Sequence, residues 1–194
     1  MQSDGPLLVV IAGPNGSGKT TLTSYLIEKK RIKTAIINPD EIAFNEFGSY
    51  QHQVKAARLA LDRRKTALLN NNDVAFESTF SGNSEINDIK QAIKLGYKVI
   101  LYYVALQSVL DNVIRVKERQ FKLGHNVENG DIIRRFHSSQ TNLINYISLF
   151  DTAYLFDNSE AVRSRVAIFS HGKASWVNPK HIRHPFYQKL FNQI

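Results

Sequence analysis

The sequence predicts an α/β fold in which a parallel sheet carries helices on both of its faces. Strand-like and helix-like segments alternate along most of the 194 residues, as expected for parallel strands joined by helical crossovers. The first strand, Leu7–Ala12, is a continuous apolar run, which indicates burial on both faces. The chain shows no internal repeat and no linker, so we expect residues 1–194 to form a single domain.

The other elements are predicted from apolar periodicity and turn residues. Helices are expected over 20–30, 53–70, 84–95, 107–122 and 131–150, and further strands over 35–38, 74–76, 97–105 and 153–157. After residue 159 the pattern changes to a small β-hairpin over 162–170 and 175–177, turned at His171–Gly172, and a helix over 184–192. We therefore expect residues from about 160 to 194 to extend the edge of the sheet.

Composition limits the environment and the partners. The chain has no cysteine, which excludes disulfides and thiolate metal sites and is consistent with a reducing cytosol. The N-terminal region lacks the pattern of a signal peptide and the length of a membrane span, so we expect a cytoplasmic protein without a membrane partner. The formal net charge of +8 favours anionic partners such as nucleotides and phosphorylated metabolites.

A glycine-rich motif, GPNGSGKT, follows the first strand and opens the first helix. It matches the Walker A pattern GxxxxGK[ST] at every defined position and predicts a P-loop NTPase- or kinase-like fold. Glycines let backbone amides point at phosphate oxygens, and the helix N-terminus adds partial positive charge. We expect Lys19 to reach the β- and γ-phosphates of ATP, and Thr20 to bind Mg²⁺. The residues expected to bind ATP are Gly13, Pro14, Asn15, Gly16, Ser17, Gly18, Lys19, Thr20, Thr21 and Asn158.

Carboxylates follow the second and third strands, at the sheet edge where the P-loop also lies, because parallel strands end on the same side. Asp40 comes after the second strand, and we predict that it is the general base for a substrate hydroxyl. The alternative is that Asp40 only caps a helix. Glu41 is interpreted as a first-turn helix residue. Substrate contacts are expected from Asn38, Glu77, Thr79 and Ser81.

A basic segment over residues 119–131 is predicted to be a lid that closes over ATP. Arg119 lies on the helix before a glycine-containing loop, and Arg134 and Arg135 lie on the helix after it. Arginines placed in this way stabilise the charge of a transferring phosphoryl group. We therefore expect Arg119 and one of the other two to be catalytic, whereas Arg115 is interpreted as a surface charge.

Together these motifs resemble the zeta-toxin family of P-loop kinases. The matching segments occur in family order over roughly residues 7 to 160: IAGPNGSGKTT, INPDEIA, FESTFSG, GYKVILYYVAL, RVKERQFKLGH, RRF and LFDNS. The resemblance implies a phosphotransferase, whose acceptor in the better-known members is a UDP-N-acetylhexosamine. It also implies that Asp40 is the general base and that Arg119 and Arg135 bind phosphate. A small helical antitoxin that blocks the nucleotide site is the implied protein partner.

Two other functions stay open. One is a kinase with another acceptor, such as a dinucleotide, a nucleoside or a nucleic-acid end. Nucleic acid is not an expected partner, because Tyr102 and Tyr103 lie in a buried strand, and the segment Trp176–Tyr187 gives only weak support for a basic, aromatic face. The other is an ABC-like ATPase or nucleotide switch without an acceptor, although the chain lacks an LSGGQ-like signature and a strand ending in Asp-Glu.

Overall fold

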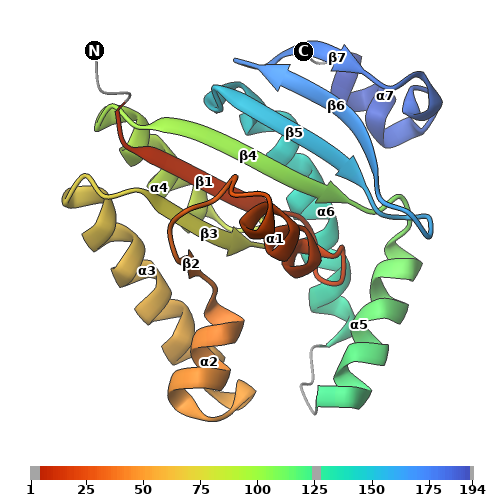
Figure 1. The fold of residues 1–194 in the computed structure, drawn as a ribbon. Helices are drawn as coiled ribbons and strands as arrows, with labels where there is room; N and C mark the ends of the chain where they lie inside the picture. The colour runs from red at the N-terminus through yellow and green to blue at the C-terminus, as the bar shows by residue number, and fades with distance from the viewer. Residues whose placement is uncertain (1–4, 124–127, 193–194) are drawn as a thin grey trace.

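The computed structural model describes residues 5–123 and 128–192, and the side chains of all of these except residues 119–123. It is an α/β protein with a seven-stranded sheet in the order β2-β3-β1-β4-β5-β6-β7 (Figure 1). The strands are β1 (Leu7–Ala12), β2 (Ile36–Ile37), β3 (Val74–Ser78), β4 (Lys98–Ala105), β5 (Thr152–Asp157), β6 (Ser164–Ser170) and β7 (Lys173–Val177). Strands β1 to β5 pair in parallel, and β6 and β7 form the predicted antiparallel hairpin.

The helices lie close to the predicted ranges. They are α1 (Lys19–Glu28), α2 (Pro39–Phe47), α3 (Gln53–Leu69), α4 (Asn83–Lys94), α5 (Val109–Leu123), α6 (Asn129–Tyr146) and α7 (Pro185–Asn192), with 3₁₀ turns η1 (Tyr50–His52), η2 (Ile147–Leu149) and η3 (Pro179–His181). The sequence indicated only the first turn of α2, which begins at Pro39 and ends before Gly48. Within the described ranges, no helix combines the length and the apolar character needed to cross a bilayer.

Strand β1 is buried on both faces, as its apolar run predicts. Leu8 and Val10 belong to the larger core cluster, whereas Val9 and Ile11 belong to a separate cluster on the other face of the sheet. Alternate side chains of a strand point to opposite faces, so neither face of β1 tolerates a polar residue. This burial fixes the point at which the chain leaves the sheet after Ala12.

The two faces of the sheet are covered unequally. Helices α3, α4, α6 and α7 contribute buried side chains to the larger cluster. On the opposite face α1 supplies Leu22 and Leu26 to the smaller cluster, and among the described elements it is the one helix in that cluster (Figure 1). The half-buried Tyr154 and Phe156 of β5 pack at the margin of this cluster. The face of β5, β6 and β7 beside α1 therefore carries partly exposed side chains.

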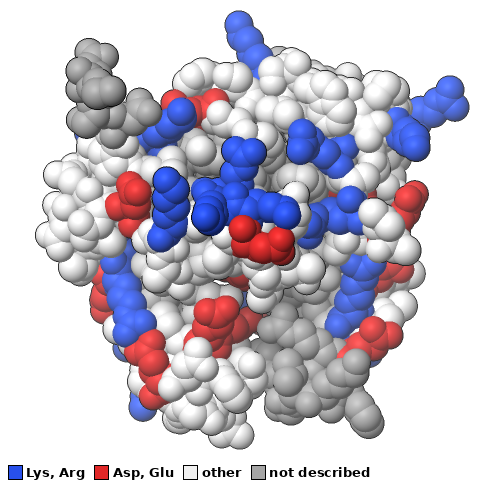
Figure 2. Space-filling model, viewed as in Figure 1, with Lys and Arg blue, Asp and Glu red and all other residues white. Residues whose placement is uncertain are grey.

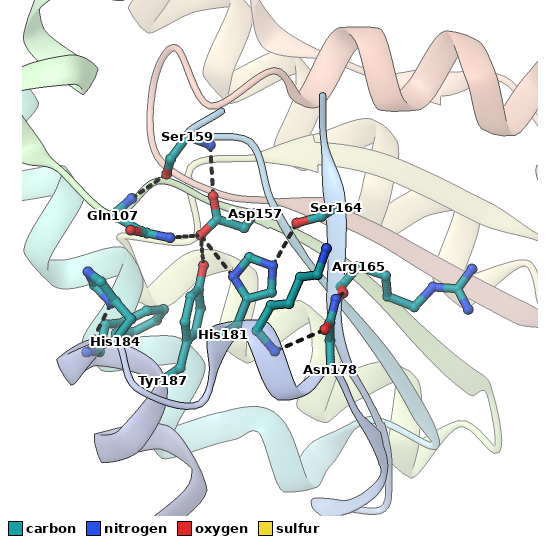
Figure 3. A network of polar contacts seen from close by, with 11 residues as sticks. Gln107, Asp157, Ser159, Ser164, Arg165, Asn178, His181, His184 and Tyr187 are labelled. Atoms are coloured by element: carbon teal, nitrogen blue, oxygen red, sulfur yellow. Dashed lines mark hydrogen bonds and ion pairs between the residues drawn. The ribbon is translucent and has the colours of Figure 1, made fainter. Parts of the chain in front are cut away.

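Polar contacts to Asp157, which is 2% exposed, hold the C-terminal extension (residues from about 160 to 192) against the end of β5. The Tyr187 hydroxyl of α7 donates to Asp157 Oδ2, and Gln107 Nε2 donates to the same oxygen at 2.9 Å (Figure 3). The Ser159 N–H donates to Oδ1 at 2.7 Å, and His181 Nδ1 lies 3.9 Å from Oδ2. These bonds join three segments that are distant in sequence.

Hydrogen bonds decide the ionisation of Asp157. Burial is the largest single influence and raises its pKa, but the bonds from Tyr187, Ser159 and Gln107 together outweigh it, so the pKa lies below its ordinary value. A lowered carboxyl pKa stabilises the fold above the ordinary value of about 3.9. That stabilisation is lost as the pH falls through the lower, folded-state pKa.

We predict that Tyr187→Phe lowers the free energy of unfolding by about 1–3 kcal/mol at neutral pH, because a buried carboxylate loses a donor. The difference from the unsubstituted protein should shrink as the pH falls through the folded-state pKa of Asp157, which lies below the ordinary value of about 3.9, because the lost bond then no longer goes to a charged group. Urea unfolding of both proteins, at neutral pH and at acidic pH, measures this difference in the free energy of unfolding. Tyr146→Phe is the control, since that hydroxyl has no hydrogen-bond partner among the described residues. Equal losses in the two variants would contradict the role of Tyr187.

Candidate active site

The P-loop adopts a conformation that requires glycine. Gly13 and Gly18 have φ angles of 141° and 95°, a region that other residues rarely occupy. A Cβ on Gly13 would lie 2.2 Å from the carbonyl oxygen of Val104 in β4, and one on Gly18 would lie 2.5 Å from Asn158 Nδ2. The loop is thus pressed against the carboxyl ends of β4 and β5, and a larger residue would displace it.

The N-terminus of α1 is suited to an anion. Its N-cap is Gly18, so no side chain caps the first amides, and its first turn carries no acidic residue. Free amides and the helix dipole favour a negative group at this end. Beside it, Ser17 Oγ and Asn15 Oδ1 are buried without a hydrogen-bond partner in the described part of the chain. Unsatisfied buried polar atoms are costly, and a bound phosphate group with its water would satisfy them.

Lys19 lies within the loop that it is expected to serve. Its Nζ donates to the carbonyl oxygens of Gly13 and Pro14 at 2.9 and 3.0 Å. These contacts hold the ammonium group over the start of the P-loop. The Lys19 ammonium group therefore lies beside the loop at which the sequence analysis expects the phosphates to bind.

Hydrogen bonds from two threonine hydroxyls to one carboxylate join α1 to β3. Thr23 Oγ1 donates to Glu77 Oε1 at 2.6 Å, and Thr20 Oγ1 donates to Glu77 Oε2 at 3.3 Å. Glu77 is 5% exposed and lies inside β3, opposite Ile11 of β1, rather than after the strand as the sequence predicted. Because both of its oxygens accept bonds from α1, Glu77 positions the helix that carries the P-loop.

Asp40 does not cap α2. The cap is Asn38, whose Oδ1 accepts the Asp40 N–H at 2.9 Å, and Pro39 occupies the first helical position. The alternative role that the sequence left open for Asp40 is therefore wrong, and the Asn38 side chain, predicted to contact substrate, is engaged in capping. Asp40 Oδ1 accepts a bond from Gln53 Nε2 at 3.2 Å, which orients the carboxylate.

Glu41 joins the acidic group at these strand ends. Partial burial raises its pKa most, followed by the negative charges of Glu77 and Asp40. The sequence analysis interpreted Glu41 as an ordinary helix residue, and only the folded arrangement shows its proximity to the other two carboxylates. Within the described residues no group of three His, Asp or Glu side chains has the arrangement of a metal site. Mg²⁺ at Thr20 would therefore depend on phosphate oxygens and water for most of its ligands.

The turn after β3 brings the other predicted substrate residues together. Thr79 Oγ1 and Ser81 Oγ lie 2.8 Å apart, on either side of Phe80, which has a φ of 57°. The Phe80 N–H donates to Ser78 Oγ, and its carbonyl oxygen accepts from Asn142 Nδ2 of α6. A non-glycine residue in the left-handed region is held there by such contacts. The turn therefore presents two linked hydroxyls on a fixed backbone.

Asn158 supports the P-loop from the end of β5. Its Nδ2 donates to the carbonyl oxygen of Ser17 at 2.8 Å, and its backbone N–H donates to Ala105 of β4 at 3.1 Å. Asp157, immediately before it, is the residue held by Tyr187. The sequence predicted Asn158 as an ATP-binding residue, and in the fold its side chain reaches the loop backbone.

Helix α5 packs on the P-loop. A Cβ on Gly16 would lie 3.2 Å from Val116 Cγ2 and 3.3 Å from Arg115 Cβ, so the residue interpreted as a surface charge sits against the loop. Asn112 of the same helix is fully buried, and both polar atoms of its side chain lack a partner in the described part of the chain. Helical periodicity alone gave no signal for this contact.

The predicted catalytic arginines are only partly defined. The side chain of Arg119 and residues 124–127 of the lid lie outside what the structure describes. On α6, Arg134 Nη2 donates to Asp131 Oδ1 at 2.9 Å, and Arg135 Nη2 lies 3.8 Å from Asp131 Oδ2. Arg134 is the more exposed of the two, with 61% of its side chain accessible against 33% for Arg135.

Comparison with known proteins agrees with this site. The family profile described as Zeta toxin matches residues 1–143. The chain belongs to the zeta toxin family. A protein of Haemophilus influenzae (strain Rd), described as uncharacterised, is 33% identical over 119 residues, which cover 60% of this chain and 83% of that protein.

Solved structures place this zeta toxin family member among P-loop kinase-like folds. The AvrRxo1-ORF1:ORF2 complex with ATP aligns with a TM-score of 0.70 at 20% identity, over 97% of this chain and 64% of that chain. The PezAT toxin–antitoxin system of Streptococcus pneumoniae aligns with a TM-score of 0.60 at 18% identity, over 87% and 72%. At such identities the likeness concerns the fold. The chain spans less than two thirds of the AvrRxo1-ORF1 chain.

We predict that Asn158→Ala weakens Mg·ATP binding by up to about tenfold and lowers the melting temperature by no more than about 6 °C. The substitution removes one amide–carbonyl bond to the P-loop, and such a bond contributes about 0.5–1.5 kcal/mol. Calorimetric titration measures the affinity. Asn178→Ala is the matched control, because Asn178 Nδ2 donates to the Arg165 carbonyl oxygen at 3.1 Å, away from the loop. An affinity loss of the same size in both variants would show that Asn158 has no specific effect on the P-loop.

Proposed function

We propose that the protein is an ATP-dependent phosphotransferase that transfers the γ-phosphoryl group of ATP to a hydroxyl of a small molecule. The observation that carries the proposal is the placement of two groups at one edge of the sheet. The P-loop and the open N-terminus of α1 follow β1. The carboxylates of Asp40 and Glu41, in the first turn of α2 after β2, and of Glu77 in β3 are close enough for Glu77 and Asp40 to act on Glu41.

The P-loop residues support the ATP half of the reaction. The amides at the start of α1, the Lys19 ammonium group and the unpaired Ser17 hydroxyl are donors for phosphate oxygens. Thr20 would hold Mg²⁺, which when bound neutralises charge on the phosphates. That ligand bond would use a lone pair of Thr20 Oγ1, so the hydroxyl could keep donating its proton to Glu77 Oε2.

Asp40 supports the transfer half. As the acceptor oxygen forms a bond to the γ-phosphorus, the bond from that phosphorus to the bridging oxygen of ADP breaks, and the acceptor proton passes to Asp40. The bond from Gln53 occupies one Asp40 oxygen and orients the carboxylate. Arg119 and Arg135 would stabilise the charge of the transferring group, as the family motifs imply.

The acceptor we propose is a UDP-N-acetylhexosamine, on the basis of the FESTFSG and NPDEIA segments. The Thr79 and Ser81 hydroxyls, held on the fixed turn at Phe80, are suited to bonds with sugar hydroxyls. A dinucleotide or nucleoside acceptor is the alternative. The test is ADP release with Mg·ATP and each acceptor in turn. Release that requires a UDP-N-acetylhexosamine supports the proposal, and equal release without any acceptor would indicate an ATPase or switch.

A small helical antitoxin is the proposed protein partner, and the reducing cytosol is the proposed compartment. The PezAT structure is described as a toxin–antitoxin system, and the AvrRxo1-ORF1 structure contains a second protein, ORF2. The absence of cysteine from the chain is compatible with a reducing compartment.

We expect Lys19→Ala to lower phosphoryl transfer by at least about 100-fold, because a donor to the transition-state charge is lost. The fold should persist, since the ammonium group bonds to loop carbonyls at a partly exposed site rather than in the core. Turnover is measured by ADP release and folding by circular dichroism. Lys33→Ala, an exposed lysine in the loop before β2, is the control. Near-normal turnover of the Lys19 variant would refute the P-loop assignment.

Asp40→Asn separates catalysis from structure. The asparagine keeps the backbone N–H that Asn38 accepts, and its amide oxygen can still accept from Gln53, so folding and Mg·ATP affinity should be unchanged. Transfer should fall by about 10²–10⁴-fold, because the amide cannot take up the acceptor proton. Calorimetry and acceptor-dependent ADP release measure the two properties. Asp62→Asn, which changes an exposed carboxylate on α3, is the control and should retain transfer. If transfer instead survives in the Asp40 variant, Glu77 becomes the candidate base.

A further inference from the structure

A ladder of alternating cationic and aromatic side chains crosses the face of the sheet that α1 leaves uncovered. Its members are, in order, Lys29, Tyr25, Arg163, Phe156, Arg165 and Trp176. Each cationic group lies between 5.7 and 6.0 Å from the centroid of the neighbouring ring, within the range of cation–π attraction. The ladder runs from the end of α1 through β5 and β6 to the edge strand β7.

Strand pairing aligns a second row beside this ladder. Tyr102 pairs with Tyr154, Tyr154 with Ile168, and Ile168 with Trp176. Residues directly opposite one another on paired strands point to the same face. The rings of Tyr102 and Tyr154 stack with centroids 4.9 Å apart. The row ends at Trp176, which is 44% exposed, and Tyr25 at the α1 end of the ladder is 47% exposed.

Two arginines of this face have no counter-charge that the structure describes, whereas Lys29 pairs with Glu28 at 3.0 Å. Neither Arg163 nor Arg165 has an ion-pair partner among residues 5–123 and 128–192. Arg31 and Arg165 also act on Tyr102: burial raises the pKa of that hydroxyl most, and the two arginines oppose the rise. In Figure 2 Lys and Arg side chains gather over α1 and the sheet beside it, and in Figure 3 Arg165 extends away from the Asp157 network.

A purely structural explanation is that the arginine stems cover apolar sheet that has no helix over it. That explanation accounts for Arg163, whose pKa burial lowers. It does not account for Tyr25 and Trp176, whose large rings are partly exposed to solvent and each have a cationic group beside them. Basic side chains alternating with exposed rings on an open sheet are the arrangement by which proteins hold phosphates and stack bases.

We propose that this face binds single-stranded nucleic acid, with bases stacked on Tyr25 and Trp176 and phosphates held by Arg31, Arg163 and Arg165. RNA and single-stranded DNA share this chemistry. The inference does not depend on the kinase reaction. It revises the expectation from sequence that nucleic acid is not a partner, although Tyr102 is buried in its strand as the sequence predicted. Arg31 follows α1, Arg163 precedes β6 and Arg165 lies in β6, and sequence spacing does not show that these three arginines share one face.

Trp176 is the only tryptophan in the chain, so its emission reports on this face directly. The experiment titrates the full chain with single-stranded RNA and DNA of about 12 nucleotides, within the ~4–16 nucleotides that sheet-based domains bind. We expect quenching of Trp176 emission and a rise in the anisotropy of a labelled oligonucleotide. Affinity should fall steeply with salt, and saturating Mg·ATP should leave it unchanged because the P-loop is a separate site.

Variants separate stacking from charge. Arg163→Gln with Arg165→Gln should weaken binding on the order of tenfold or more and reduce the salt slope by about 0.7 per lost phosphate contact. Trp176→Ala should weaken binding by about five- to 100-fold, and Trp176→Phe should restore most of it. Lys65→Gln with Lys94→Gln is the charge-matched control on α3 and α4, which cover the other face, and it should bind normally. Circular dichroism checks that each variant is folded.

Several results would overturn the proposal. Absence of quenching and of anisotropy change at low salt would leave the ladder as a structural cover. Equal weakening by the control pair, or equal affinity for a duplex of the same length, would indicate general electrostatic attraction without base stacking. Displacement of the oligonucleotide by Mg·ATP would assign it to the kinase site. A Trp176 spectrum that changes with protein concentration alone would assign the face to contact between copies of the chain.

Discussion

The burial of β1 on both faces is the constraint on which the candidate site depends. The strand lies between β3 and β4 with apolar side chains on both faces, and the chain leaves it after Ala12 at the carboxyl end of the sheet. The carbonyl oxygen of Val104 then limits the next position to glycine. Lys19 and Thr20 directly follow this loop. The Lys19 ammonium group bonds to a carbonyl oxygen of the loop, and Glu77 of the neighbouring strand accepts a bond from Thr20 at the start of α1.

The carboxylates of Asp40, Glu41 and Glu77 repel one another, and the raised pKa of Glu41 reports that repulsion, after the larger effect of burial. Their closeness costs stability, and hydrogen bonds from Gln53, Thr20 and Thr23 offset part of it. Sites in which like charges are brought together in this way are often functional. A cation or a phosphate-bound metal ion next to them would relieve the repulsion.

Much of the fold was predictable because its signals are local. The apolar run of β1, the P-loop glycines and the turn at Gly172 each predict one structure, and the structure confirms them. The role of Asn38 as the cap was missed, because the sequence analysis assigned Asn38 to substrate contact and considered only Asp40 as a cap, although both side chains favour helix starts. Contacts such as Gln53 with Asp40, or α5 with Gly16, join segments whose meeting depends on packing, and no sequence spacing encodes them.

The link between Tyr187 and Asp157 has a consequence for how the protein is made. These residues are 30 positions apart, and the loop support from Asn158 begins at the position after Asp157. On a ribosome, the segment up to β5 emerges well before α7 does. During that interval Asp157, at the carboxyl end of β5, lacks the hydrogen bond from the Tyr187 hydroxyl. Full support of the nucleotide loop is therefore reached only after α7 has been made and has packed against the end of β5.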